Sequence, residues 1–419
     1  HDPREGARMK ILHVNKFLYP RGGAEAYLLA VSALQGERGH DIAYFGMAHP
    51  QNRPSRFEEH FPERVELNPP PASVPGKLKA AARLLYSPSA RRGMEAVVEE
   101  FEPDVVHLHN IYHQLSPSVL RPLKKRSVPT IMTLHDYKLA CPTYLFLHQG
   151  KPCEACLGGR FHHAALKRCN NGSLAASALN ALELSMHTFG GAYDPIHVFA
   201  CPSRFLAAKM AAAGVYPDRL RRIPNFVDCS GIPLKAEPGG GVTYAGRLSH
   251  EKGLDVLIRA VGRLGVGVPL DVAGEGPERA AFEALAQELP VSVRFHGRLG
   301  KEELYRLVAS SSVTVLASRC HENQPMAVLE SFACGVPVIG TELGGVPELI
   351  DPGVDGALVP PNDPEALAEA LAGFLSDPGA ALGMGRAGRR KVEQHFSPQR
   401  HLERLEELYA EAAAAARMA

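Results

Sequence analysis

Two glutamates in the stretch "CHENQPMAVLESFACGVPVIG", Glu322 and Glu330, lie eight positions apart. Pro325 between them suits the first turn of a helix, because its missing N–H is not needed there, and Gly335 suits the helix end. The predicted helix, 325–334, would direct free backbone N–H groups and a positive dipole end at an anion. A diphosphate bound there would leave Glu330 within reach of a ribose. The alternative is a solvated Glu322 and a Glu330 on the helix surface.

Two cations follow an expected strand in "YAGRLSHEKGL", where Arg247 ends the strand and Lys252 precedes a helix. Two fixed cations on such a loop suit a pair of phosphates, since arginine binds through a planar fork and lysine as a point charge. The alternative is a surface ion pair between Lys252 and Glu251. The conjunction with the helix of Glu330 favours the phosphate site.

Glycines follow two other expected strands: Gly22 and Gly23 in "YPRGGAE", and Gly274 and Gly276 in "GEGP". Neither pattern matches the dinucleotide fingerprint G-x-G-x-x-G. Glycine allows the backbone to approach a ligand closely, but ordinary tight turns use it as well. Each pair by itself is therefore a weak indication of a binding site.

The elements that must position these residues are short apolar runs alternating with helical patterns. Such runs suit parallel sheets that helices cover on both faces. The expected strands are 10–15, 41–46, 104–110, 130–136 and 197–203, then 242–247, 270–276, 293–298, 313–318 and 336–341. We predict an α/β protein with two doubly wound, Rossmann-like domains facing across a cleft, where ligands bind beyond the carboxyl ends of the strands.

The Pro- and Gly-rich stretch 223–241 is the expected linker between the two domains. We place the first domain at 9–228, with a Cys-rich insertion at 137–172, and the second at 238–395. The last stretch, 396–419, reads as a helix that packs back on the first domain.

The composition is that of an ordinary globular protein, with 45% apolar residues, 22% charged residues and a net charge of +1 in 419 residues. This charge gives no indication of nucleic-acid binding. No apolar run is long enough to span a membrane, and no secretory signal precedes Met9. We therefore expect a cytoplasmic protein.

Several motifs together resemble family 4 of the retaining glycosyltransferases, which have the two-domain GT-B fold. They are "YAGRLSHEKGL", "VAGEGP", the E-x7-E element "ENQPMAVLE" with "SFACGVPVIG" after it, and "GGVPELI". Upstream, "PRGGAEAYL", "TLHDY" and "PSRFLAAKM" also fit the family, more loosely. The resemblance covers nearly the whole chain, and it implies an acceptor-binding first domain and a donor-binding second domain.

The resemblance implies roles at the matching positions. Arg247 and Lys252 would clamp the donor diphosphate, Glu330 would hold the ribose hydroxyls, and Glu322 would contact the transferred sugar. His135, at the end of an expected strand, matches a histidine that lines the active site, although a histidine there is often a plain hydrogen-bonding residue.

Further positions would complete the donor site. Gly22 and Gly23 would approach the donor from the first domain, and the nucleotide base would rest against the backbone near Arg298 and Leu299. Residues of the 323–327 segment would supply backbone N–H groups, except for Pro325, which has none: Asn323, Gln324, Met326 and Ala327.

If the family pattern holds, transfer is retaining and needs no metal, because fixed cations and the helix end stabilise the leaving group. UDP-sugars are the favoured donors and GDP-mannose is next; the acceptor is a saccharide, a lipid-linked molecule or a small molecule. A sugar-nucleotide 2-epimerase, a phosphorylase and a non-catalytic nucleotide-sugar binding protein are the alternatives.

Four cysteines lie in the insertion: Cys141, Cys153, Cys156 and Cys169. Cys153 and Cys156 form a CxxC with the spacing of a zinc knuckle, so a structural zinc ion is a hypothesis. His148, His162 and His163 are substitute ligands. Free thiols and a disulfide are the alternatives.

Residues 77–92, "KLKAAARLLYSPSARR", carry five cations, no acid and interleaved apolar residues. Such a segment can lie on an anionic membrane surface or bind an anionic acceptor. The simpler alternative is a solvated helix face.

Overall fold

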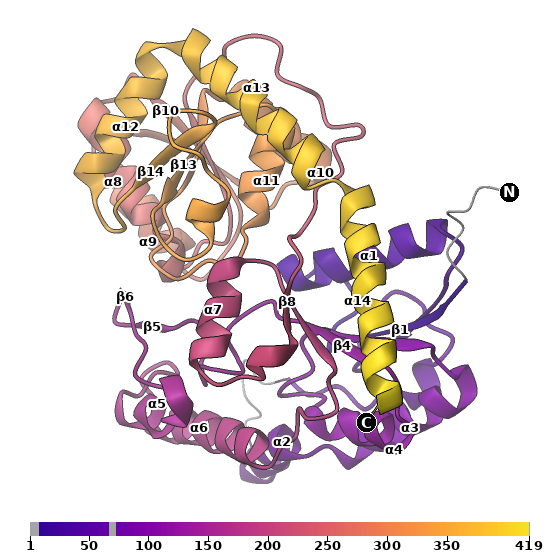
Figure 1. Cartoon of the computed structure of the whole chain (residues 1–419). Helices are drawn as coiled ribbons and strands as arrows, with labels where there is room; N and C mark the ends of the chain where they lie inside the picture. Colours follow the sequence, from indigo (N-terminus) through magenta and orange to yellow (C-terminus); the bar gives the residue numbers. More distant parts are fainter. Residues whose placement is uncertain (1–7, 67–72, 419) are drawn as a thin grey trace, which may run out of the picture.

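The computed structural model describes residues 8–66 and 73–418, which form two α/β domains, each built on a six-stranded sheet (Figure 1). The first sheet has the order β2-β1-β3-β4-β7-β8, and all its neighbouring strands are parallel. Its strands are β1 (Lys10–Val14), β2 (Asp41–Phe45), β3 (Val105–Leu108), β4 (Thr130–Thr133), β7 (Val198–Cys201) and β8 (Leu220–Arg222).

The second sheet is also parallel throughout, with the order β11-β10-β9-β12-β13-β14. Its strands are β9 (Val242–Ala245), β10 (Pro269–Ala273), β11 (Ser292–Gly297), β12 (Val313–Leu316), β13 (Val338–Thr341) and β14 (Gly356–Val359). The two doubly wound domains expected from the sequence are confirmed. Sequence reading missed the edge strands β8 and β14, which have few residues and weak apolar patterns. Residues 67–72 and Ala419, which the sequence assigned to the first domain and the last helix, lie outside the described residues.

Helices cover both faces of each sheet. Those of the first domain are α1 (Gly23–Glu37), α2 (Val74–Leu85), α3 (Pro88–Phe101), α4 (Leu120–Lys125), α6 (Leu174–Phe189) and α7 (Arg204–Ala212). Those of the second are α8 (Leu254–Leu264), α9 (Arg279–Glu288), α10 (Lys301–Ser310), α11 (Met326–Ala333), α12 (Pro364–Ser376) and α13 (Pro378–His395).

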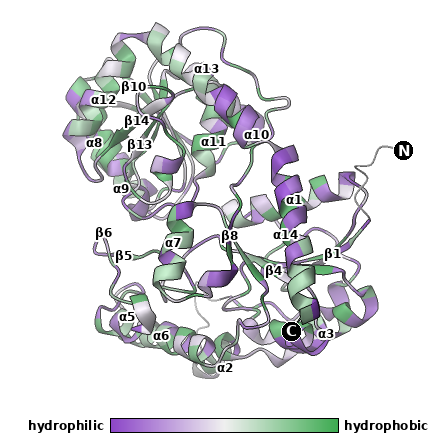
Figure 2. Ribbon diagram, viewed as in Figure 1, coloured by the Kyte–Doolittle hydropathy of each residue, from purple (hydrophilic) through white to green (hydrophobic). Residues whose placement is uncertain are grey.

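Alternate residues along each strand enter different cores, because successive side chains point to opposite faces of a sheet. In β1, Leu12 and Val14 join the core under α3 and α4, whereas Ile11 joins the core on the opposite face. Both faces are therefore apolar, and the strands at the centre of each domain are mostly hydrophobic, with mixed colours on the outer helices (Figure 2). His13, two residues after Ile11, breaks this rule and is nevertheless fully buried.

The C-terminal helix α14 (Pro398–Met418) runs from the second domain down onto the first (Figure 1). Leu402, Leu405 and Leu408 pack in the same core as Ile11 and Val105 of the first sheet. Within residues 8–66 and 73–418, no helix has both the length and the apolar character that crossing a membrane requires.

An insertion follows β4 and lies at the side of the first domain. It contains a short antiparallel hairpin, β5 (Leu147–His148) and β6 (Lys151–Pro152), and the helix α5 (His162–Leu166). α5 packs against α6.

Candidate active site

The second sheet reverses its winding direction between β9 and β12, and the candidate site lies at the ends of these two strands. A doubly wound sheet binds ligands at such a switch point. Lys252 comes from the short turn His250–Lys252 after β9, and Glu322 comes from the loop after β12. The Lys252 Nζ donates to Glu322 Oε1 at 2.6 Å, and the Ser318 hydroxyl donates to the same oxygen at 2.5 Å. Lys252 therefore pairs with Glu322 and not with Glu251, the alternative considered from the sequence. Glu251 instead accepts from the Ser249 hydroxyl.

This ion pair is largely removed from solvent, and its charges hold each other in place. Burial raises the pKa of Glu322, but the Lys252 ammonium outweighs it, so the pKa is lowered overall. Burial lowers the pKa of Lys252, and the Glu322 carboxylate reverses that effect, so the pKa is raised overall. Both groups are therefore charged at neutral pH, and the Lys252 ammonium is fixed in place by its Glu322 partner.

Arg247 follows β9 with an exposed side chain, and none of the hydrogen bonds or ion pairs among the described residues involves its guanidinium. Its backbone is fixed, because Tyr244 Oη donates to the Arg247 carbonyl at 2.9 Å. A free cation on a fixed backbone can turn toward an anionic ligand at the strand end.

Gly274 and Gly276 are explained by packing between two loops. A Cβ on Gly274 would lie 1.8 Å from the Gly246 carbonyl oxygen, and one on Gly276 would lie 2.1 Å from that of Leu248. Gly274 also has a φ of +144°, which L residues rarely adopt. These glycines therefore let the loop after β10 press against the loop that carries Arg247.

Helix α11 begins one residue later than the sequence predicts, with Pro325 as its N-cap residue (φ −68°, ψ 121°). Met326 and Ala327 carry the first backbone N–H groups of the helix, and the loop of Glu322 comes directly before them. Glu330 is half-buried, and burial raises its pKa to about 7, partly opposed by the charge of Lys301. Its carboxylate makes no hydrogen bond to other described residues, as expected for a group that a ligand completes.

The loop after β12 also contacts the first domain, in a contact that we call the seam. Asn323 donates from Nδ2 to the Leu134 carbonyl at 3.0 Å and accepts from the Ser203 hydroxyl at 2.9 Å. Tyr137 Oη donates to the Glu322 carbonyl at 3.5 Å. His135 lies between Leu134 and Tyr137 in the sequence, so it belongs to the segment of the first domain that meets the loop of Glu322.

Glu348 closes the seam at one side, and sequence analysis missed it. Its carboxylate accepts from the backbone N–H groups of Arg204 and Phe205, at 2.9 and 2.7 Å, at the start of α7 in the other domain. The sequence signal was the "GGVPELI" motif, whose glycine Gly345 packs against the Asn323 carbonyl.

Two further contacts join the domains near the predicted donor residues. Gln324 Oε1 accepts from the backbone N–H of Asn225 at 2.5 Å. Arg298 donates to the Pro20 carbonyl at 3.1 Å, which places the loop of Gly22 and Gly23 opposite the end of β11. Both glycines are exposed. Leu299 follows Arg298 and is half-exposed.

His135 is the last member of a hydrogen-bonded series of histidines that sequence analysis did not identify. His135 Nε2 lies 3.0 Å from His109 Nδ1, and His109 Nε2 lies 3.2 Å from His13 Nδ1. Burial lowers the pKa of His135 to about 3, so the ring is neutral at physiological pH. The available signal was the alternation in "HVN" and "VVHLHN", which puts polar rings on one face of two buried strands.

Asp136, beside His135, does not orient that ring. Its Oδ1 accepts from the Lys138 backbone N–H at 2.9 Å, and its Oδ2 accepts from Tyr112 Oη. Lys138 in turn donates to Glu183 of α6 at 2.8 Å, in a fully buried ion pair. These bonds fix the chain just after His135 and tie it to α6.

The four cysteines of the insertion are free thiols that lie near one another. Burial raises the pKa of Cys156 to about 12, and Cys141, Cys169 and Cys153 add to this increase. Among the described residues, however, the groups whose ligand atoms come within 4.8 Å of one another are a buried histidine trio and a Glu–His–Glu cluster at the surface. The four sulfurs do not reach that spacing, and the zinc site stays a prediction.

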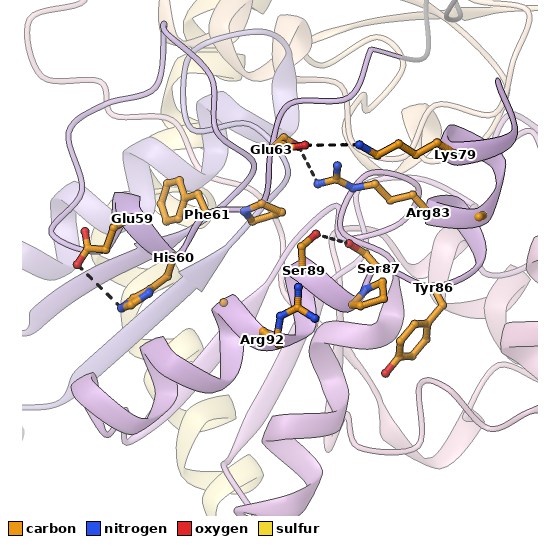
Figure 3. Close-up of a pocket in the computed structure, with 14 residues that line it drawn as sticks. Glu59, His60, Phe61, Glu63, Lys79, Arg83, Tyr86, Ser87, Ser89 and Arg92 are labelled. Atoms are coloured by element: carbon orange, nitrogen blue, oxygen red, sulfur yellow. Dashed lines mark hydrogen bonds and ion pairs between the residues drawn. The ribbon is translucent and has the colours of Figure 1, made fainter. Parts of the chain in front are cut away.

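A separate cavity of about 650 Å³ lies in the first domain and shares no lining residue with the site above (Figure 3). The predicted basic segment lines it through Lys79, Arg83 and Arg92, and Glu63 pairs with Lys79 at 3.7 Å. Arg83 is buried and donates to the carbonyls of Glu63 and Gln114. The cations of 77–92 therefore do not form one exposed basic face.

Comparisons with known proteins match both halves of the chain. Residues 21–230 match the model "Glycosyltransferase Family 4", and residues 233–391 match "Glycosyl transferases group 1". The glycogen synthase of Mycobacterium tuberculosis is 33% identical over 186 residues, which is 42% of this chain and 45% of that protein. The D-inositol 3-phosphate glycosyltransferase of Saccharomonospora viridis is 34% identical over 226 residues, 48% of this chain and 52% of that protein. The chain thus spans about half the length of the curated relatives it matches.

Solved structures match over nearly the whole chain and show the fold. Sucrose-phosphate synthase from Thermosynechococcus elongatus has a TM-score of 0.73 and 21% identity, covering 97% of this chain and 100% of its own. Anabaena HepE, in complex with UDP and glucose, has a TM-score of 0.65 and 18% identity, covering 96% and 100%.

Proposed function

Because the chain belongs to glycosyltransferase family 4, we propose that it transfers a sugar from a nucleotide sugar to an acceptor hydroxyl with retention of configuration. The observation that carries the proposal is the Lys252–Glu322 pair at the switch point of the second sheet, in a loop that contacts the segment of His135 at the seam. A fixed ammonium, the start of a helix and a neutral histidine together suit a sugar diphosphate.

In this proposal the diphosphate lies between Lys252, Arg247 and the start of α11. The free guanidinium of Arg247 and the ammonium of Lys252 neutralise the charge that builds on the leaving phosphate. Glu330 accepts hydrogen bonds from the ribose hydroxyls, which explains a half-buried carboxylate without a protein partner. Backbone N–H groups of Met326 and Ala327 lie at the helix end that faces the phosphate.

The carboxylates near the transferred sugar are already engaged, which favours attack from the same face as the leaving group. Glu322 is held by Lys252 and Ser318, and Asp136 by Tyr112 and a backbone N–H. The bond from the anomeric carbon to the phosphate oxygen breaks as the bond to the acceptor oxygen forms, and the leaving phosphate takes the acceptor proton. Contact between the domains at the seam excludes water from this step.

We propose a UDP-sugar as the donor and GDP-mannose as the next candidate. Anabaena HepE was crystallised with UDP, whereas a Corynebacterium glutamicum relative, 33% identical over 168 residues, is named a GDP-mannose-dependent mannosyltransferase. The acceptor is a saccharide, a lipid-linked molecule or a small molecule. The exposed Arg92 at the cavity in Figure 3 suits an acceptor that carries an anionic group, and contact of segment 77–92 with a membrane remains part of the proposal.

A donor screen tests the proposal. Thermal shifts are measured with UDP, GDP, ADP and their sugars, first with EDTA and then with Mg²⁺, and the best donor is assayed for hydrolysis and transfer. We expect one nucleotide series to stabilise the protein, turnover to persist in EDTA, and the product to keep the anomeric configuration of the donor by NMR. Epimerisation of the donor without transfer, or binding without any turnover, would refute the function.

Zinc content is measured on the same preparation. About one zinc ion per chain, lost in a Cys153→Ser/Cys156→Ser variant, would support the structural zinc site, and no bound zinc would refute it. A loss of turnover in EDTA that accompanies unfolding would indicate this structural ion, whereas a loss in the folded protein would contradict metal-independent transfer.

A further inference from the structure

A chain of hydrogen bonds runs from His135 at the seam into the interior of the first domain. It passes from His135 to His109 at 3.0 Å, from His109 to His13 at 3.2 Å, and from His13 Nε2 to Gln35 Oε1 at 2.7 Å. Gln35 then donates from Nε2 to Tyr409 Oη of α14 at 2.8 Å. His109, His13 and Gln35 are each 0% exposed, so water does not compete for these bonds.

Each histidine in the chain is neutral and therefore carries one N–H group. Burial lowers the pKa of His13 to about 4 and that of His135 to about 3, and it holds the pKa of His109 well below its usual value. A neutral imidazole donates through one nitrogen and accepts through the other. In a series of such rings, the tautomer of one ring fixes the tautomer of the next.

The Gln35 amide sets the direction of the whole series. Because its oxygen faces His13, His13 must donate from Nε2 and accept at Nδ1. His109 must then donate from Nε2 and accept at Nδ1, and His135 must donate from Nε2. A flipped amide would reverse every proton in the series, so a residue far from the seam selects the state of His135.

We propose that Gln35, His13 and His109 are positioning residues that hold His135 in the Nε2–H tautomer, with the Nδ1 lone pair left to accept a hydrogen bond from a hydroxyl of the bound sugar or acceptor. The hydrogen bond from a sugar or acceptor hydroxyl rests on the proposed function, whereas the Nε2–H tautomer of His135 is independent of it. Within the described part of the chain, His135 Nδ1 has no hydrogen-bond partner.

The C-terminal helix completes the arrangement from outside the sheet. Tyr409 accepts from Gln35, so its own proton goes to His107 Nδ1 at 2.8 Å, and His107 Nε2 meets the Thr133 hydroxyl at 2.7 Å. This second branch ends two residues before His135. The hydrogen bond from Tyr409 to His107 uses the tyrosine proton, which stabilises the Gln35 orientation that the relay needs.

A metal ion held by His13, His107 and His109 is the competing interpretation, since their ligand atoms lie within 4.8 Å of one another. The hydrogen bonds above occupy both ring nitrogens of each of these histidines. Binding an ion would break several of these buried bonds, whose partners would be left unpaired. The geometry therefore favours the relay.

The tautomer is measured directly on the full chain. Protein labelled with [¹⁵N]histidine gives separate NMR signals for protonated and unprotonated ring nitrogens, and the signals missing in His135→Gln assign His135. We expect the wild type to show His135 protonated at Nε2 alone. A single Nδ1–H tautomer or an imidazolium at neutral pH would overturn the proposal, as would bound metal on these rings.

Two variants at the same position separate the relay from packing. In His109→Asn, an amide group takes the place of Nδ1 opposite His135, but the link to His13 is cut, whereas His109→Leu also removes the polar group. We expect His109→Leu to lose the single tautomer and to lower kcat about 10- to 100-fold, as loss of a proton-positioning group does, with the donor KM unchanged. His109→Asn should also give mixed tautomers, because Gln35 no longer orients the acceptor, and it should lose less kcat than His109→Leu.

Gln35→Leu provides the same test at the far end of the series, should the His109→Leu variant fail to fold. It should give mixed His135 tautomers and a lower kcat while the nucleotide thermal shift is retained. A single Nε2–H tautomer and wild-type kcat in either leucine variant would overturn the relay. If the tautomer results hold but no nucleotide sugar is turned over by the wild type, the relay stands and the proposed function fails.

Discussion

The two domains present their candidate groups to the seam by opposite physical means. The second domain uses charge: Lys252 and Glu322 form an ion pair, and Arg247 stands free beside it. The first domain uses neutral hydrogen bonds, which support His135 through rings with lowered pKa values. Lys252 and Glu322 are 70 positions apart in the sequence, whereas the neutral series reaches from His13 to Tyr409.

The difference matches what the proposed function requires of each side. A diphosphate brings negative charge that fixed cations can balance, and the second domain has charged groups at a strand switch point. A histidine that exchanges hydrogen bonds with hydroxyl groups needs a defined proton position rather than a charge. A buried series of neutral hydrogen-bonded rings supplies this defined proton position, because it has few alternative arrangements of its protons.

The first domain contains one exception to its use of neutral groups, and the largest expected effect tests this exception. Lys138 and Glu183 form a buried ion pair beside His135, so Glu183→Ala leaves an unpaired buried ammonium and should cost about 3–5 kcal/mol of unfolding free energy. Denaturant unfolding measures it, with exposed Glu37→Ala as the control. A cost below about 1 kcal/mol would show that the first domain does not depend on this pair.

The same pair gives an acid-sensitive stability. Burial raises the pKa of Glu183, but His113 and Lys138 outweigh it, so the folded-state pKa lies below the ordinary 4.5. An acid with a lowered folded pKa contributes stability above its unfolded pKa, and that contribution is lost as the pH falls below about 4.5. Glu183→Gln should therefore lose less stability than the wild type between neutral pH and acid.

The next effect tests the charged side. Lys252→Ala removes the ammonium that would face the diphosphate and leaves Glu322 unpaired, so we expect kcat/KM to fall on the order of 10²–10³-fold. Lys124→Ala, at an exposed lysine of α4, is the control and should match the wild type. Unchanged turnover in Lys252→Ala would contradict the proposal that the charged groups of the second domain act on the diphosphate.

A smaller effect tests the contact that holds the two sides together. Glu348→Ala frees two backbone N–H groups at the start of α7, and loss of such a cap costs about 0.5–2 kcal/mol. We expect a lower Tm and a lower kcat, since Glu348 joins the two domains that carry His135 and Glu322. Exposed Glu342→Ala should change neither. A lower Tm with an unchanged kcat would show that Glu348 serves stability alone.

The smallest effect concerns Glu330, whose pKa burial raises to about 7. If its carboxylate accepts from a ribose, nucleotide affinity should rise as the pH increases through about 7, by no more than about tenfold per pH unit. The free energy of unfolding should fall as the pH rises. A carboxyl whose pKa is higher in the folded state loses its stabilising contribution between pH 4.5 and 7. Calorimetry on the wild type and Glu330→Gln separates this from phosphate titration, and equal pH dependence in both would exclude the role.

The sequence by itself determined the two parallel sheets and pointed to the charged candidate residues, because both depend on local signals. Apolar runs predict buried strands, and the charged candidates lie within short motifs: Arg247, Lys252 and Glu322 after strands and Glu330 inside a helix. Only the tertiary structure decided the rest. Asn323 and Glu348 act on the other domain, and Gln35, His13, His109 and Tyr409 meet only after β1, β3, α1 and α14 have packed. No local pattern reports these contacts, since a neutral buried side chain shows its role only through partners that are distant in sequence.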